Sequence, residues 1–278
     1  MKTTYWLLAS LATLTITGCF ERNVATEQLC ANTPELRCEN LNIDDGQCRI
    51  PRTNLIWHRY EQFKHPSEEN QIEEYQIEEY GIVAEYRKCL ELASQIVPID
   101  QSDLKAQRFN ALVHSIDELE RIVEELKVSE KPETLYFLWS QTGDTQARHK
   151  FLQMEGSAKL NTAEMQYALA TLYANRDAPK TLTLLNNALS LSNEDNLNPI
   201  ILKSLASIHQ GQGEKKRAYL WAMVAKRFGV SVADEKQMRI MFDFNDPVQY
   251  QKLDDLAKSI SNNIEQGSYS PDLIPENI

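Results

Sequence analysis

Histidine is the first residue type to consider for chemistry, and the chain has five copies. His58 and His65 lie about two helical turns apart, with Glu61 between them on a similar face if the segment is helical. Imidazole and carboxylate groups at such spacing could hold a metal ion. Pro66 would end the helix directly after His65, so we favour histidines that are solvated or packed in a core. We predict no metal and no other cofactor.

Adjacent carboxylates occur at Glu73-Glu74, Glu78-Glu79 and Asp254-Asp255. General acid–base catalysis needs one carboxylate of a pair in an apolar pocket, where burial separates the two pKa values. Nothing in the sequence predicts such a pocket, and it contains no serine-hydrolase elbow, zinc-peptidase motif or phosphate-binding loop. We therefore expect a protein that is not an enzyme. The alternative is a cell-envelope hydrolase, acting on glycans or cell wall, whose carboxylate site has no recognisable motif.

Cysteine is the third reactive residue type, with five copies. Cys30, Cys38, Cys48 and Cys89 lack the paired C-x-x-C spacing of zinc sites, so we predict disulfides rather than a metal site. Four cysteines allow three pairings. We favour Cys30–Cys38 with Cys48–Cys89, because the first pair closes a short local loop and the second would tie the N-terminal segment to a long helix. The other pairings stay open.

The fifth cysteine, Cys19, ends a segment with the pattern of an export signal. Lys2 precedes a nearly continuous apolar run over Tyr5–Leu14, which is shorter than the ~20 residues that a membrane-spanning helix needs. Residues 16–19, Ile-Thr-Gly-Cys, resemble the lipobox of bacterial lipoproteins. This resemblance implies a signal peptide over residues 1–18, a diacylglyceryl thioether on Cys19 and a further acyl chain, such as palmitate, on the new amino terminus.

The residue after Cys19 carries the expectation about location. In lipoproteins with this signal, an aspartate at that position retains the protein in the inner membrane, and here the position holds Phe20. The resemblance therefore implies a lipid anchor in the outer membrane, with the chain facing the periplasm; the inner membrane is the alternative. Several acyl chains together anchor a protein durably, since each buried methylene contributes ~0.8 kcal/mol.

Composition favours helices and excludes one class of partner. Glycine is scarce, with nine copies in 278 residues, and good helix formers such as Leu, Glu, Ala, Gln and Lys are frequent. We therefore predict an all-α protein. The formal net charge of −11 repels phosphate backbones, so we expect no nucleic-acid partner.

The N-terminal part is expected to join a small, irregular, disulfide-bearing segment over residues 19–52 to a long helical hairpin over residues 53–130. This region would open with a short helix over Asn54–Lys64 and continue with a long helix from Ser67 to Val97, where Pro98 blocks continuation.

Two patterns mark the hairpin. Tandem copies of Gln-Ile-Glu-Glu-Tyr occupy residues 71–75 and 76–80, and we expect their glutamates to form a solvated helix face rather than an acidic recognition surface. A second helix would begin at Ser102 and carry a heptad seam. The seam residues are Phe109, Leu112, Ile116, Leu119, Val123 and Leu126.

From residue 131 to 264 the pattern changes to short helices that repeat about every 34 residues, the signature of tetratricopeptide arrays. Phe151, Leu185 and Tyr219 are spaced at this interval. Residues 204–229 resemble a Sel1-type repeat. The residues that carry this resemblance are Gly211, Gly213, Ala218, Trp221 and Ala225. We predict helix-turn-helix repeats with C-terminal capping helices, followed by a flexible tail over residues 265–278.

Arrays of helical repeats expose a groove that suits peptides or partner proteins. The residues that we expect to line it are Tyr136, Trp139, Gln166, Tyr173 and His209. Residues 45–53, Asp-Gly-Gln-Cys-Arg-Ile-Pro-Arg-Thr, together with the lipobox and the helical body, resemble a family of Gram-negative lipoproteins. That resemblance implies no activity. We predict a non-catalytic interaction or scaffold module, held to the membrane by its lipid and binding a protein or peptide of the envelope.

Overall fold

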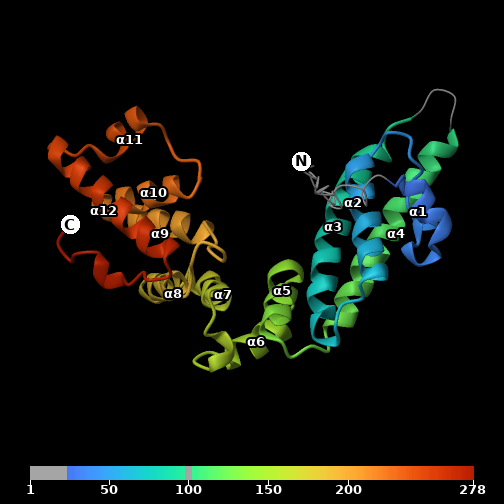
Figure 1. The fold of residues 1–278 in the computed structure, drawn as a ribbon, viewed down its shortest axis with the longest axis horizontal. Coiled ribbons are helices and arrows are strands. Elements are labelled where there is room, and N and C mark those ends of the chain that lie inside the picture. The colour runs from blue at the N-terminus through green and yellow to red at the C-terminus, as the bar shows by residue number, and fades with distance from the viewer. Residues whose placement is uncertain (1–23, 98–101) are drawn as a thin grey trace, which may run out of the picture. The chain divides into compact units, whose positions relative to one another are not determined.

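The computed structural model describes residues 24–97 and 102–278, and these residues form helices, turns and loops without a strand. The predicted all-α class is confirmed. The chain divides between Leu126 and Lys127 into two compact units (Figure 1), called here the N-terminal and C-terminal units. The expected signal peptide and Cys19 lie outside the described residues. No described helix is both long and apolar enough to cross a membrane.

The N-terminal unit consists of three long helices and a short-helical segment that packs on them. Helix α2 packs against α3, and α3 packs against α4. The elements are α1 (Thr26–Asn32), η2 (Pro34–Leu36), η3 (Cys38–Asn40), α2 (Arg49–Lys64), η4 (Glu69–Gln71), α3 (Ile72–Ala93) and α4 (Ser102–Leu126).

Two helix starts differ from the prediction. Helix α2 begins at Arg49 rather than Asn54, because Pro51 falls in the first turn, where its missing N–H leaves no helical hydrogen bond unmade. Helix α3 begins at Ile72 rather than Ser67. Ser67 does not cap it, since its hydroxyl donates to Gln62 Oε1 at 2.8 Å.

The buried face of α4 differs from the predicted seam, because several buried positions lie one residue before the predicted ones. Phe109 and Ile116 are 55% and 38% exposed. The buried positions are Arg108, Ala111, Ser115, Leu119, Ile122 and Leu126. Arg108 can take a core position because its guanidinium lies 2.7 Å from Asp45 and also donates to the Ala93 carbonyl. A periodicity of apolar residues cannot reveal such a paired arginine.

Both favoured disulfides are confirmed. Cys30–Cys38 joins α1 to η3, and its partners have a sequence separation of eight. Cys48–Cys89 spans 41 residues and joins the start of α2 to α3. Together they hold the N-terminal segment on the long helices.

The C-terminal unit consists of helix pairs followed by two further helices. Helices α5 and α6, α7 and α8, and α9 and α10 pack as pairs, and α12 packs on α10. The elements are α5 (Pro132–Thr142), α6 (Thr145–Gln153), η5 (Ala158–Leu160), α7 (Ala163–Tyr173), α8 (Ala178–Ser190), α9 (Ile200–Gly211), α10 (Lys215–Arg227), α11 (Glu235–Phe242), α12 (Pro247–Glu265) and η6 (Pro271–Leu273).

Local signals set these helices. Gly143 ends α5 with a φ of 75°, a value that a residue with a Cβ rarely adopts. Thr162 caps α7 by accepting a hydrogen bond from the Met165 N–H. The residues spaced about 34 apart, Phe151, Leu185 and Tyr219, occupy the second helix of each pair and are buried.

The end of the chain, expected to be flexible, packs on the C-terminal unit. The Tyr269 side chain is buried, contacts the Trp221 ring with a centroid distance of 6.1 Å, and donates to Asn186 Oδ1. The Arg217 guanidinium donates to the carbonyls of Pro275 and Glu276. Burial of the aromatic ring offsets the entropy lost when the segment is ordered.

Candidate functional site

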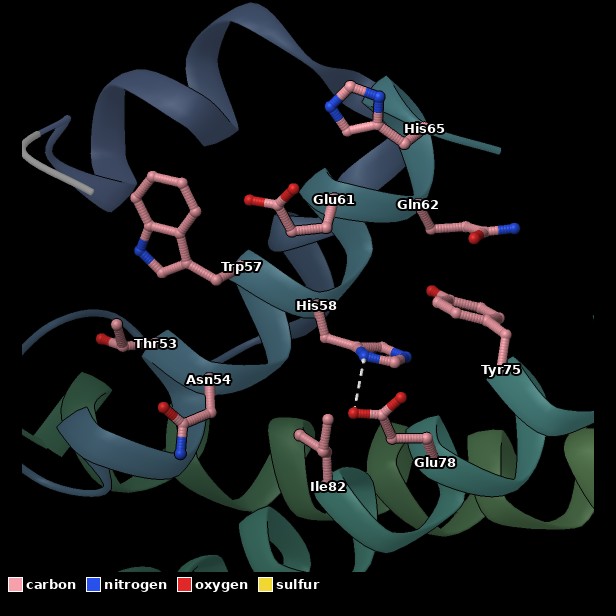
Figure 2. A pocket seen from close by; sticks show the side chains of 10 residues that line it. All are labelled: Thr53, Asn54, Trp57, His58, Glu61, Gln62, His65, Tyr75, Glu78 and Ile82. Atoms are coloured by element: carbon pink, nitrogen blue, oxygen red, sulfur yellow. Dashed lines mark ion pairs between the residues drawn. The ribbon is translucent and has the colours of Figure 1, made fainter. Parts of the chain in front are cut away.

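A groove with a cavity of about 660 Å³ lies between α2 and α3 (Figure 2). The positions on α2 recur every three or four residues, so they share one face of that helix. The lining residues are Thr53, Asn54, Trp57, His58, Glu61, Gln62 and His65 from α2 and its C-cap, and Tyr75, Glu78 and Ile82 from α3.

A buried ion cluster behind the groove sets the register of the two helices. Arg59 Nε donates to Glu79 Oε1 at 2.7 Å, and Arg59 Nη2 donates to Glu118 Oε1 at 2.9 Å. Arg59 Nη1 donates to the Leu36 carbonyl at 3.1 Å. A buried guanidinium needs this many partners, because an unpaired one would carry a large desolvation cost.

Glu118 forms ion pairs with three arginines. Burial by itself would raise the pKa of its carboxyl, but the hydrogen bond from Arg121 and the charges of Arg59 and Arg37 outweigh burial and lower the pKa below its usual value. Arg37 Nη2 lies 2.8 Å from Glu118 Oε1. Glu118 is therefore ionised at neutral pH, and the cluster joins α2, α3, α4 and the N-terminal segment.

His58 is a largely buried titratable group of the groove lining, with a side chain that is 9% exposed. Its ring stacks on that of Tyr75, with a centroid distance of 4.3 Å and planes 6° apart. Nδ1 lies 3.8 Å from Glu78 Oε1. Burial lowers the pKa of the imidazole, and the nearby carboxylates of Glu78 and Glu79 offset only part of that effect. The ring is therefore neutral at neutral pH.

The carboxylates of the lining are open to solvent. Glu61 and Glu78 are exposed carboxylates, so neither has the buried, apolar surroundings that would adapt it as a general acid. His58 and His65 do line the same cavity. Within the described ranges, no three His, Cys, Asp or Glu side chains come together in a group able to hold a metal ion.

A second hollow, of about 470 Å³, lies on the C-terminal unit across α7, α8 and α9. Small residues at helical spacing, such as Ala170 on α7, Ala174 at its C-cap, and Ser204 and Ser207 on α9, leave room between the helices. The remaining lining residues are Tyr167, Thr171, Asn175, Thr181, Leu185, Ile200, Lys203 and Ile208.

The residues predicted to line a groove lie elsewhere in this unit. Tyr136 and Trp139 form one aromatic cluster on α5, with ring centroids 6.0 Å apart. Gln166 bridges two segments, donating to the Leu160 carbonyl and accepting from Asn187. None of these three lines the hollow.

The other two predicted residues are held by charged neighbours. The Tyr173 hydroxyl donates to Glu155 at 2.6 Å, and Lys180 Nζ lies 3.7 Å from the centre of its ring. His209 is buried, with Nδ1 2.6 Å from Glu214. Neither lines the hollow. Of the five predicted residues, Tyr136 and Trp139 lie in contact with each other, and none of the five lines the hollow.

Comparison with known families places the chain in one of them. A family model described as "Protein of unknown function (DUF2989)" matches residues 16–223. The chain belongs to this family. The matched range of DUF2989 includes both disulfides, the α2–α3 groove and the hollow on α7, α8 and α9. No curated protein and no solved structure matches the chain.

In this DUF2989 chain, the sequence-based prediction for Glu79, which lies behind the groove, is wrong. It was expected on a solvated face, but it is 3% exposed and paired with Arg59. Glu74, the equivalent residue of the first tandem copy, is exposed. Five residues rotate a helix by about 500°, so the two copies face different surroundings. The sequence signal for this pairing is Arg59, an arginine within the apolar pattern of the preceding helix α2.

Proposed function

We propose that the protein is a lipid-anchored, periplasm-facing module that binds another protein of the cell envelope and has no catalytic activity. The lipobox-like residues 16–19 support the anchor, and Phe20 supports the outer membrane. The two disulfides support export, because such bonds persist in oxidising compartments.

The observation that carries the proposal is the hollow across α7, α8 and α9. It is lined by apolar side chains such as Leu185, Ile200 and Ile208, with Lys203 and several hydroxyl groups among them. A surface hollow of mixed apolar and polar character that spans three helices suits a peptide or an amphipathic helix. In this proposal the helix pairs α5–α6, α7–α8 and α9–α10 are tetratricopeptide- or Sel1-like repeats.

The state of the buried carboxylates supports a non-catalytic role. Glu79 and Glu118 are carboxylates enclosed among α2, α3 and α4, and both are held by arginine guanidinium groups. An envelope hydrolase with a carboxylate site would need one acid placed in an apolar cleft with a raised pKa.

Site-specific crosslinking in cells tests the interaction. A photoreactive amino acid replaces Ser207, an exposed residue of the hollow, and in a matched control it replaces Lys258, an exposed residue of α12. We expect Ser207 to capture one reproducible envelope protein that Lys258 does not capture. Equal capture at both positions, or capture of no protein at Ser207, would contradict the proposal.

Membrane fractionation tests the anchor separately. Cys19→Ala should abolish incorporation of labelled palmitate and move the protein out of the outer-membrane fraction, because the thioether can no longer form. Cys30→Ala, which removes a disulfide cysteine, serves as the control and should leave the anchor intact. Full membrane retention of the Cys19→Ala protein would contradict the lipidation.

A further inference from the structure

The groove between α2 and α3 has a charge that selects its ligand. Its lining includes the carboxylates of Glu61 and Glu78 and contains no lysine or arginine. Arg59, the basic residue nearest His58 in sequence, lies in the ion cluster behind the groove, where Glu79 and Glu118 accept its hydrogen bonds. The lining therefore contains no lysine or arginine that would neutralise the carboxylates of Glu61 and Glu78.

Aromatic and apolar side chains lie beside these carboxylates. Trp57 and Tyr75 contribute rings, and Ile82 contributes an aliphatic side chain (Figure 2). Lysine and arginine carry a long apolar stem that packs on such surfaces, while the charged end reaches a carboxylate or the face of a ring. A neutral ligand would form no ion pair with Glu61 or Glu78, and these carboxylates would repel an anionic ligand.

The groove is long enough for several residues. The lining follows α2 from Thr53 to His65, which is roughly 18 Å at 1.5 Å per residue. An extended chain advances about 3.3 Å per residue, so about five residues would fit along it. Such a length suits a peptide segment better than a compact metabolite.

We infer that the α2–α3 groove binds a short extended segment of a partner protein through that segment's lysine or arginine side chains. Glu61 and Glu78 take the cationic ends, and Trp57 and Tyr75 pack on the stems. The Arg59–Glu79 pair holds the two helices at the spacing that this requires. The inference concerns the N-terminal unit, so it depends neither on the lipid anchor nor on the hollow of the C-terminal unit.

Fluorescence anisotropy with a defined probe tests the inference on the purified full chain. The probe is a fluorescein-labelled peptide, Gly-Lys-Gly-Lys-Gly, and its control replaces both lysines with norleucine, which keeps the stem and removes the charge. We expect the lysine peptide to bind, the norleucine peptide to bind at least tenfold more weakly, and added salt to weaken the lysine peptide.

The protein variants test the named residues. Glu61→Gln combined with Glu78→Gln should weaken the lysine peptide about tenfold, since each exposed ion pair contributes a factor of a few. Glu120→Gln removes an exposed carboxylate on α4, outside the groove, and should leave binding unchanged. Both glutamates that the double variant replaces are exposed in the parent. The unfolding curve of the variant should therefore match that of the parent, which would show an intact fold.

Three outcomes would overturn the inference. The norleucine peptide could bind as tightly as the lysine peptide, or the folded double variant could bind as tightly as the parent. Spermidine, added as a free polyamine, could bind at this groove while neither peptide does, which would assign the site to a small cation. Failure of the crosslinking at Ser207 would bear on the proposed function alone.

Discussion

Arg59 Nε donates a hydrogen bond of 2.7 Å to Glu79 Oε1, and both side chains are less than a tenth exposed. One residue earlier on each helix, His58 and Glu78 lie 3.8 Å apart in the groove. The same alignment of α2 with α3 therefore produces both the buried Arg59–Glu79 pair and the His58–Glu78 contact in the groove. Because Arg59 also binds Glu118 on α4, three helices meet at a single guanidinium.

Arg59→Met should destabilise the N-terminal unit strongly. The substitution keeps most of the side-chain volume but removes the 2.7 Å hydrogen bond from Arg59, which leaves the buried Glu79 carboxylate facing the more exposed Arg37 at 3.5 Å. Removal of one partner from a buried pair costs roughly 3–5 kcal/mol. Urea unfolding of the purified protein, followed by circular dichroism, would measure the loss in the free energy of unfolding.

The double variant Arg59→Met with Glu79→Met separates the cost of an unpaired charge from the cost of lost packing. It should recover most of the lost stability, because Glu118 keeps its contacts with Arg37 and Arg121. A double variant that is as unstable as Arg59→Met alone would show that the cluster acts through packing rather than through charge.

Loss of the two disulfides should have unequal effects. Cys48–Cys89 closes a segment of 41 residues and Cys30–Cys38 closes one of eight. Loop-closure entropy predicts that the serine variants lower the free energy of unfolding by about 4 kcal/mol for the long segment and about 2.5 kcal/mol for the short one. Denaturant unfolding of the two double-serine proteins would measure both losses, and a larger loss for the short segment would contradict this account.

Acidification should weaken the N-terminal unit through His58. Burial lowers the pKa of this imidazole in the folded state, while the facing carboxylates Glu78 and Glu79 raise it in part and Arg59 lowers it. The unfolded chain therefore binds a proton first as the pH falls below about 6.5. Stability from the neutral ring is complete above that pH and is lost as the pH falls toward the lowered value.

The measurement is the free energy of unfolding at pH 7.5 and at pH 5.5. We expect the difference between the two pH values to be smaller in His58→Asn than in the parent. His149→Asn changes an exposed histidine and should keep the parent's difference. An unchanged difference in His58→Asn would exclude His58 as the source.

The packed C-terminal tail should contribute to the stability of the C-terminal unit. Tyr269→Ala removes a buried ring that contacts Trp221, which costs roughly 3–5 kcal/mol, whereas Tyr269→Phe removes only the hydroxyl that donates to Asn186, about 1 kcal/mol. Thermal unfolding would rank the variants. Glu276→Gln, at an exposed side chain of the same tail, should leave the midpoint unchanged; a Tyr269→Ala midpoint equal to it would show that the tail is dispensable.

Local chemistry is sufficient to set several ends of helices. Pro132 and Pro247 begin helices, and Gly143 ends one, because each fixes or frees a backbone angle within a single turn. The all-α class followed from composition. The favoured disulfide pairing was correct because Cys30 and Cys38 are close along the chain.

Tertiary structure alone decided which helix faces are buried and where the groove lies. The same pentapeptide places Glu74 in solvent and Glu79 in the core, since only the second copy faces Arg59 on α2. Arg108 replaces Phe109 in the buried face of α4 because Asp45 comes from a distant segment to pair with it. A helix starts and stops through contacts within a few residues, whereas the burial of a charge depends on a partner that only the folded chain brings near.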